Sequence, residues 1–182
     1  MMMEKPMNWD SVEAIRGGGK RLTPGGHACK IVSAKVQTSK AGNQMLVIAF
    51  DIVGGEFDGY FSGIFNRAKQ NSTAEPKWPN SGVYRQVTGG DSMGRFKGML
   101  LNIEESNQGY KWNWDESSLV GKKFGGVFRE EEYKANSGDI KTRIVCIGIH
   151  AIEGIEDIEV PAIKKLALSG MSAGYPEEEI PF

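Results

Sequence analysis

The chain has 182 residues, of which 40% are hydrophobic and 25% charged, as is usual for one globular domain with extensions. No apolar run approaches the roughly 20 residues of a membrane-spanning helix, and the first ten residues show no secretory signal, so we expect no membrane association. The two cysteines, Cys29 and Cys146, are far apart and form no paired motif. A disulfide framework is therefore not expected, and the sequence favours a reducing cytoplasm.

The formal net charge of −1 conceals an asymmetry along the chain. Residues 1–150 carry 20 Lys/Arg and 16 Asp/Glu, whereas residues 151–182 carry 2 Lys/Arg and 7 Asp/Glu. A mildly basic body with an acidic end is compatible with a polyanionic ligand on the body and another partner on the tail. Solvation alone also accounts for charges of this size.

The first half of the chain predicts an N-terminal extension and two strands. The extension covers residues 1–21 and includes a possible short helix at 7–16, which a run of three glycines ends. Residues 27–37 alternate between apolar and polar, and the apolar face changes near the start, which is typical of a long, bent strand in a small barrel. A hairpin loop then leads to a largely apolar, buried strand at 45–53.

The second half predicts three more strands and one helix. We predict a third strand at 60–65, followed by a long polar excursion. Apolar residues at helical spacing predict a helix at 92–106. Two further strands follow at about 122–133 and 140–151, joined by a turn with the sequence NSGD.

This order of elements predicts the fold class. Three strands, a helix and then a hairpin form the order of an OB-fold, a small five-stranded barrel that often binds oligonucleotides. We therefore predict a mainly β chain: a five-stranded OB-fold-like barrel over residues 22–160, with one helix inserted between strands three and four. Residues 161–182, rich in Gly, Ser, Ala, Pro and Glu towards the end, are predicted to form a flexible acidic tail.

Signatures of catalysis and of metal binding are weak. The run GGGK at 17–20 lacks the spacing of a phosphate-binding loop and has no apolar strand before it. Two strands side by side could in principle offer a zinc site, with His27 and Cys29 on the first strand and Cys146 and His150 on the last, but the spacing matches no usual zinc pattern. We therefore expect no enzyme activity, no metal and no cofactor.

Basic and aromatic residues instead favour binding of single-stranded DNA. A basic groove follows the phosphates, while aromatic rings stack on bases without sequence preference. In an OB-fold the ligand crosses strands two and three, between the first and the last hairpin loops. The candidates on this path are Lys40, Tyr60, Phe61, Phe65, Arg67, Trp78, Tyr84, Arg85, Lys122, Arg129, Lys141 and Arg143.

Large aromatic residues are also the usual filling of a core, and this alternative applies to Phe61 and Phe65. Trp78 and Tyr84 lie in polar surroundings, so we expect these two to be exposed.

The last six residues form the most specific local signal. Three glutamates keep the end extended, and the apolar residues and terminal carboxylate that follow can dock on an apolar pocket with a basic rim. The predicted protein-binding residues are Glu177, Glu178, Glu179, Ile180, Pro181 and Phe182.

Two stretches resemble known proteins. The terminal EEEIPF resembles the acidic tip of bacterial single-stranded DNA-binding proteins, usually DDDIPF, with Glu in place of Asp. Over about 22–155 the body resembles a family of phage and prophage single-stranded DNA-binding proteins, through the runs TSKAGNQM (38–45), FKGM (96–99), ESN (105–107), GYKWN (109–113) and REEEY (129–133). The resemblance implies an OB-type binder in phage replication or recombination. It also implies that the tip docks on host or phage replication and repair proteins.

The sequence therefore predicts a sequence-independent binder of single-stranded DNA in the bacterial cytoplasm. The alternative is a recombination accessory or scaffold that contacts proteins rather than DNA. A nuclease is disfavoured because no carboxylate or histidine cluster stands out. Whether the chain forms homo-oligomers is left open, because the tetramer of the bacterial proteins does not carry over to this different body.

Overall fold

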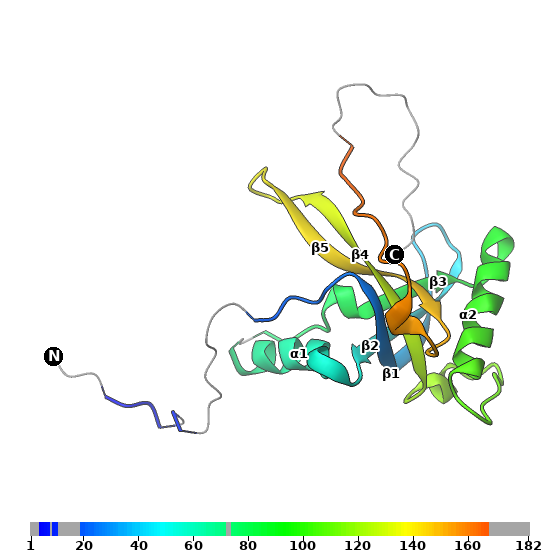
Figure 1. Cartoon of the computed structure of the whole chain (residues 1–182), viewed down its shortest axis with the longest axis horizontal. Coiled ribbons are helices and arrows are strands. Elements are labelled where there is room, and N and C mark those ends of the chain that lie inside the picture. Colours follow the sequence, from blue (N-terminus) through cyan, green and yellow to red (C-terminus); the bar gives the residue numbers. More distant parts are fainter. Residues whose placement is uncertain (1–3, 8, 11–18, 72–73, 168–182) are drawn as a thin grey trace.

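The structure is a computed structural model that describes residues 4–7, 9–10, 19–71 and 74–167 (Figure 1). The possible N-terminal helix falls largely outside the described residues, and the acidic tip lies outside them entirely. The described residues form a mainly β fold, with one five-stranded antiparallel sheet and two α-helices among them. Neither helix in the described part of the chain is long and apolar enough to cross a bilayer.

The strands follow the spatial order β3-β2-β1-β4-β5. Their bounds, in chain order, are β1 Gly25–Thr38, β2 Gln44–Ile52, β3 Val83–Val87, β4 Lys123–Lys134 and β5 Ile140–His150. The helices are α1 Tyr60–Asn71, between β2 and β3, and α2 Met93–Glu105, between β3 and β4. Short 3₁₀ turns occupy several connections, among them η2 at Asn80–Gly82.

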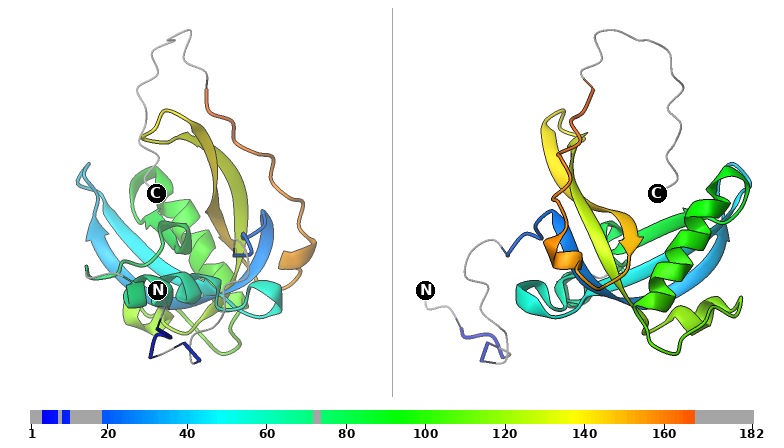
Figure 2. Two further views of the ribbon diagram at one scale, coloured as in Figure 1. Left: turned by 90° about the vertical axis from the view of Figure 1, so that its left-hand side faces the viewer. Right: turned by 45° about the vertical axis from the view of Figure 1, so that its right-hand side comes forward.

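Strand β1 joins the two halves of the sheet. Its first residues pair with β4, and from Cys29 onward it pairs with β2. The register with β2 shifts between Ile31 and Ser33, and such an irregularity bends a strand and increases its twist. The sheet is therefore strongly curled, and the β4–β5 hairpin projects from its body as an arm (Figures 1 and 2).

The predicted third strand at 60–65 is wrong, because these residues begin helix α1. Asp51, at the end of β2, accepts hydrogen bonds from the backbone N–H groups of Phe61 (2.8 Å) and Ser62 (3.1 Å). These are donors of the first helical turn, which have no partner inside the helix. Gly59 makes the turn into the helix with φ 69°, a backbone conformation that favours glycine. The true third strand, β3, lies inside the excursion that we expected to be irregular.

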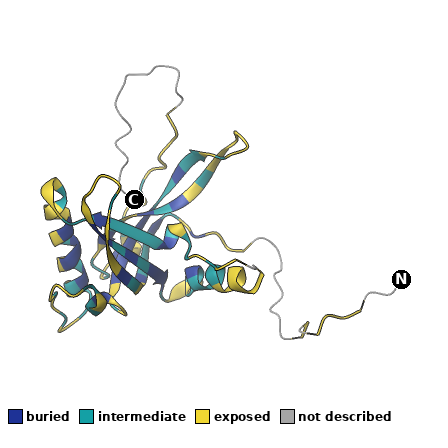
Figure 3. Ribbon diagram, turned by 180° about the vertical axis from the view of Figure 1, so that it is seen from behind, coloured by how far each residue is buried: buried dark blue, intermediate teal, exposed yellow. Residues whose placement is uncertain are grey.

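The core is built around the ring of Phe50 on β2. Phe61 from α1 and Phe124 and Phe128 from β4 make edge-to-face contacts with it, at centroid distances of 5.4–6.0 Å. All four rings are completely buried. Helix α1 packs on β2, while α2 packs on β5 and also contacts β3 and β4, so that the two helices cover different parts of the curled sheet (Figures 2 and 3).

Two features differ from the expected barrel with one helix. Helix α1 is a second helix, and β3 and β5 come into contact without pairing, so the sheet is open between them. Residues 161–167, expected to belong to the flexible tail, lie along β4: the N–H of Lys164 donates to the carbonyl of Glu130, and the N–H of Glu132 donates to the carbonyl of Lys164, both at 2.9 Å. This part of the expected tail is therefore attached to the domain.

Candidate nucleic-acid interface

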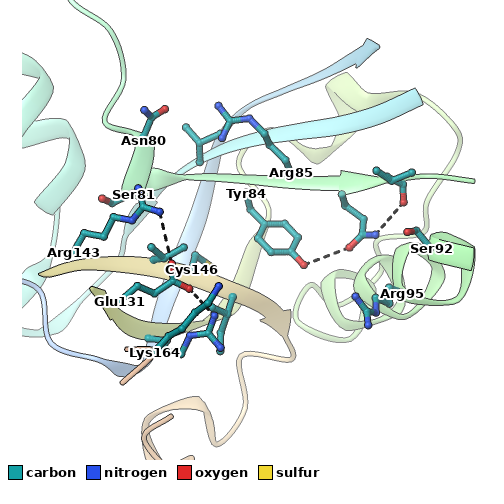
Figure 4. A pocket seen from close by; sticks show the side chains of 16 residues that line it. Asn80, Ser81, Tyr84, Arg85, Ser92, Arg95, Glu131, Arg143, Cys146 and Lys164 are labelled. Carbon is teal, nitrogen blue, oxygen red and sulfur yellow. Dashed lines mark hydrogen bonds and ion pairs between the residues drawn. The ribbon is translucent and has the colours of Figure 1, made fainter. Parts of the chain in front are cut away.

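A cleft of about 660 Å³ lies where the sheet is open, between β3 and the β4–β5 hairpin (Figure 4). The N-terminal end of α2 and the segment around Lys164 complete its walls. The cleft is lined by Asn80, Ser81, Val83, Tyr84, Arg85, Gln86, Val87, Ser92, Arg95, Arg129, Glu131, Arg143, Val145, Cys146, Ile147 and Lys164.

The charge of the lining is strongly one-sided. Five of these residues are basic and one, Glu131, is acidic. The basic residues come from five separate segments of the chain: Arg85 from β3, Arg95 from α2, Arg129 from β4, Arg143 from β5 and Lys164 from the segment beside β4. This concentration of positive charge in one concave site raises the local concentration of an anionic ligand.

Strand alternation brings the residues of β4 and β5 together. Arg129 and Glu131 are two residues apart on β4, so their side chains point to the same face. Arg143 lies directly opposite Glu131 in the β4–β5 register, and cross-strand partners on one face are neighbours. The pairing of β4 with β5 therefore places Arg129, Glu131 and Arg143 together in the cleft.

Glu131 is 3% exposed and forms ion pairs with both arginines. Its carboxylate lies 2.5 Å from Nη2 of Arg129 and 3.7 Å from Nη2 of Arg143. The buried Nε of Arg129 has no hydrogen-bond partner among the described residues. No ion pair is formed by Arg85 or Arg95 within the described part of the chain, so both guanidinium groups remain available to an anion.

Tyr84 supplies an aromatic ring to the wall formed by β3. Its hydroxyl donates to Oε1 of Gln86 (3.3 Å), and Nε2 of this buried glutamine donates to the carbonyl of Val87 (2.9 Å). Burial raises the pKa of the Tyr84 phenol, so it remains neutral at physiological pH. The half-buried ring is thus held at the cleft and carries no charge that would repel phosphate.

Four of the twelve predicted DNA-binding residues line the cleft: Tyr84, Arg85, Arg129 and Arg143. Lys141 is exposed on β5, two residues before Arg143. Lys40 lies in the turn between β1 and β2 and is also exposed.

The remaining predicted residues lie elsewhere. Lys122 precedes β4 rather than lying on it, and its Nζ is 4.7 Å from the centroid of the Tyr110 ring. Arg67 is exposed on α1. The predicted exposure of Trp78 and Tyr84 is wrong, because both are half-buried and pack against the core.

Three predicted aromatic residues belong to α1 rather than to a strand. Phe61 is completely buried, so its ring offers no face to a base, and we no longer assign it to DNA contact. Tyr60 packs edge-to-face on Phe61 (5.1 Å). Phe65 packs against Trp78, with ring centroids 5.5 Å apart, and Nε1 of Trp78 donates a 3.1 Å hydrogen bond to the carbonyl of Gly82. The predicted tail residues 177–182 lie outside the described residues.

The sequence interpretation missed three charged residues of the cleft. Arg95 precedes Phe96 on an amphipathic helix, where an exposed arginine is ordinarily a solvated side chain. Lys164 lies beyond the expected end of the domain, and Glu131 is one of three consecutive glutamates. The alternation of β4 distinguishes Glu131 from Glu130 and Glu132, and this was the available signal.

Three of the four side chains of the candidate zinc arrangement have other surroundings. The ring of His27 packs edge-to-face on Phe57 and Phe128, both at 5.5 Å, and its Nε2 lies 2.8 Å from the carbonyl of Thr23. Cys29 and Cys146 are buried free thiols, and burial raises the pKa of both, that of Cys146 to about 12. No three His, Cys, Asp or Glu side chains of the described residues form a group that could hold a metal ion.

The sequence matches no model of a known protein family and no curated protein. The cleft is therefore interpreted from its own geometry and charge.

Proposed function

We propose that the cleft between β3 and the β4–β5 hairpin binds single-stranded DNA with little sequence preference. The observation that carries this proposal is the presence of five basic side chains and the Tyr84 ring around one cleft with a single acidic residue. The arginines and the lysine neutralise phosphates. The face of Tyr84 stacks on a base, an interaction that every base offers and that does not select sequence.

The arrangement of strands supports the same function. We propose that the curled sheet is an OB-type barrel that is partly open between β3 and β5. Such barrels bind oligonucleotides between the loop joining strands one and two and the loop joining strands four and five. In this chain those loops carry Lys40 and, on the adjoining arm, Lys141, so that the exposed basic residues extend the path beyond the cleft.

The tail and the setting of the function remain proposals from the sequence. The tip from Glu177 to Phe182 docks on replication or recombination proteins, outside the DNA site. The protein acts in the cytoplasm of a bacterial host during phage replication or recombination. It requires no cofactor and is not an enzyme, so an oligonucleotide incubated with the protein and Mg²⁺ is recovered intact.

A second candidate is a protein-binding accessory, and one observation favours it. β3 and β5 face the cleft without pairing with each other, and an unpaired strand edge can accept an extended peptide. An acidic peptide could form backbone hydrogen bonds with the strand edge and ion pairs with the arginines. This candidate predicts that such a peptide displaces DNA from the cleft, or binds where DNA does not.

Fluorescence anisotropy with labelled oligo-dT, the same length of duplex and an acidic peptide tests the proposal. We expect oligo-dT to bind more tightly than duplex at low salt, and the double variant Arg85→Ala with Arg95→Ala to lose at least tenfold in affinity. The matched control is Lys30→Ala with Lys35→Ala, which removes the same charge from exposed positions of β1 outside the cleft. Equal binding of oligo-dT and duplex, or an equal loss in both double variants, would contradict the proposal.

A further inference from the structure

The buried carboxylate of Glu131 is an unexpected component of an anion-binding cleft. It is 3% exposed, whereas the side chains of its two partners, Arg129 and Arg143, retain 28% and 48% of their exposure. The arginines are therefore accessible to a ligand from the open side of the cleft, while the carboxylate lies beneath them. In the absence of DNA, Glu131 occupies the position of a counter-ion.

Glu131 is fixed in this position by the backbone on both sides of β4. On one side it pairs in register with Arg143 of β5. On the other side Lys164 forms a parallel bridge opposite Glu131, through the hydrogen bonds to the carbonyl of Glu130 and from the N–H of Glu132. The backbone of Glu131 is therefore held on both sides, and its buried carboxylate stays close to Arg129 and Arg143.

The orientation of the arginines does not depend on Glu131 alone. The guanidinium of Arg143 lies over the ring of Tyr133, 5.5 Å from its centroid, on the same face of the hairpin. Removal of the negative charge therefore leaves Arg143 directed towards the cleft. The main effect of removing the charge of Glu131 is to end the competition between the carboxylate and an incoming phosphate for the guanidinium groups of Arg129 and Arg143.

We propose that Glu131 is an internal competitor for phosphate that sets the affinity of the cleft for DNA. In the free protein it neutralises part of the charge of Arg129 and Arg143, and on binding these groups turn to the DNA backbone. The protein thereby holds DNA less tightly than its arginine content allows, as is required of a protein that must release the strand. This inference rests on the proposed function of the cleft.

The first experiment compares Glu131→Gln with Glu130→Gln in the full-length chain, using labelled oligo-dT over a range of salt concentrations. Glu130 is the matched control because it precedes Glu131 on the same strand but pairs with Arg21 (3.3 Å) on the opposite face. We expect Glu131→Gln to tighten binding about tenfold, because a nearby buried unit charge no longer opposes the phosphate. The slope of log K against log salt should become steeper by about 0.7 for each additional phosphate contact.

A double-mutant cycle locates the effect. Arg143→Ala should weaken binding about threefold in the parent, where Glu131 already neutralises part of its charge, and about tenfold or more in the Glu131→Gln background. Equal losses in the two backgrounds would show that Arg143 and Glu131 act independently, and would overturn the inference.

Thermal unfolding with and without oligo-dT checks that the variants are folded. Oligo-dT should raise the melting temperature of Glu131→Gln more than that of the parent, because phosphate replaces the lost counter-ion. If this variant does not fold, Glu131→Asp keeps the charge but lengthens the contact with Arg143, and we expect binding between that of the parent and tenfold tighter. Unchanged or weaker binding by the folded variant overturns the inference alone, whereas a parent that does not bind oligo-dT overturns the proposed function itself.

Discussion

Replacement of Asp51 by alanine should lower the free energy of unfolding by about 3 kcal/mol, because this carboxylate anchors helix α1 to β2. It accepts hydrogen bonds from the N–H groups of Ile52 (2.9 Å), Phe61 (2.8 Å) and Ser62 (3.1 Å), and Asp51 is 8% exposed. A hydrogen bond to a charged group contributes about 1.5–3 kcal/mol, and a buried donor left without a partner costs about 1–3 kcal/mol. Water can reach the N–H of Ser62 more easily than the buried N–H of Phe61. The expected loss of stability therefore lies near the lower end of the sum of these two ranges.

Urea unfolding monitored by circular dichroism measures this loss of stability, and the variants are compared on the condition that their m-values are unchanged. The informative control is Asp51→Asn, which retains one carbonyl oxygen for the bonds to Ile52 and Phe61 and should cost about 1–2 kcal/mol. Both variants should bind oligo-dT as the parent does while folded, since Asp51 does not line the cleft. An alanine variant within about 0.5 kcal/mol of the parent would refute the anchoring role.

Three further predictions concern the thiol, the ring and the tail. Because burial raises the pKa of Cys146 from 9.0 to about 12, the stability due to its neutral thiol is complete below pH 9 and is lost as the pH rises towards 12. Between pH 8 and pH 10 the free energy of unfolding, measured with urea, should therefore fall by about 1.4 kcal/mol more in the parent than in Cys146→Ala. Equal decreases in the two proteins would contradict the raised pKa. Tyr84→Leu should weaken oligo-dT binding about 5- to 150-fold in an anisotropy titration while Tyr84→Phe binds nearly as the parent does, because the stacking face is retained; equal effects would exclude stacking. Deletion of residues 180–182 should leave oligo-dT affinity unchanged or slightly higher and abolish capture of replication proteins in a pull-down, and a large loss of DNA affinity would mean that the tail belongs to the DNA site.

The strongly periodic elements were predictable from the sequence to within one or two residues. The strand expected at 27–37 is Gly25–Thr38, and the helix expected at 92–106 is Met93–Glu105. The last two strands also lie where expected, at Lys123–Lys134 and Ile140–His150. In each case one buried face imposes a regular pattern that is visible in the sequence.

The region between β2 and α2 was not predictable for a physical reason. Helix α1 begins where Asp51, some ten residues earlier in the chain, supplies the acceptor for its first N–H groups. A cap that comes from another element leaves no local signal, while Tyr60 and Phe61 are residues that strands favour. Strand β3 has the opposite problem, because its buried Gln86 appears polar in the sequence and is accommodated only by Tyr84 and the carbonyl of Val87.

The candidate site divides in the same way. Arg129 and Arg143 were among the candidates because they are basic residues on the two strands of the last hairpin, and the pairing of that hairpin is local. Arg95 and Lys164 reach the cleft only through the packing of α2 and of the segment along β4. The sequence therefore indicated part of the basic lining, while the position of the cleft, at the opening between β3 and β5, required the structure.

The salt dependence of oligo-dT binding, compared between the parent and the Arg85→Ala with Arg95→Ala double variant, tests the central claim most directly. Each phosphate contact with a single strand contributes about −0.7 to the slope of log K against log salt. We predict that the double variant has a slope shallower by about 1.4, while the Lys30→Ala with Lys35→Ala control keeps the slope of the parent. A parent slope near zero, or an identical slope in the parent and the cleft variant, would contradict the assignment of the cleft as the DNA site.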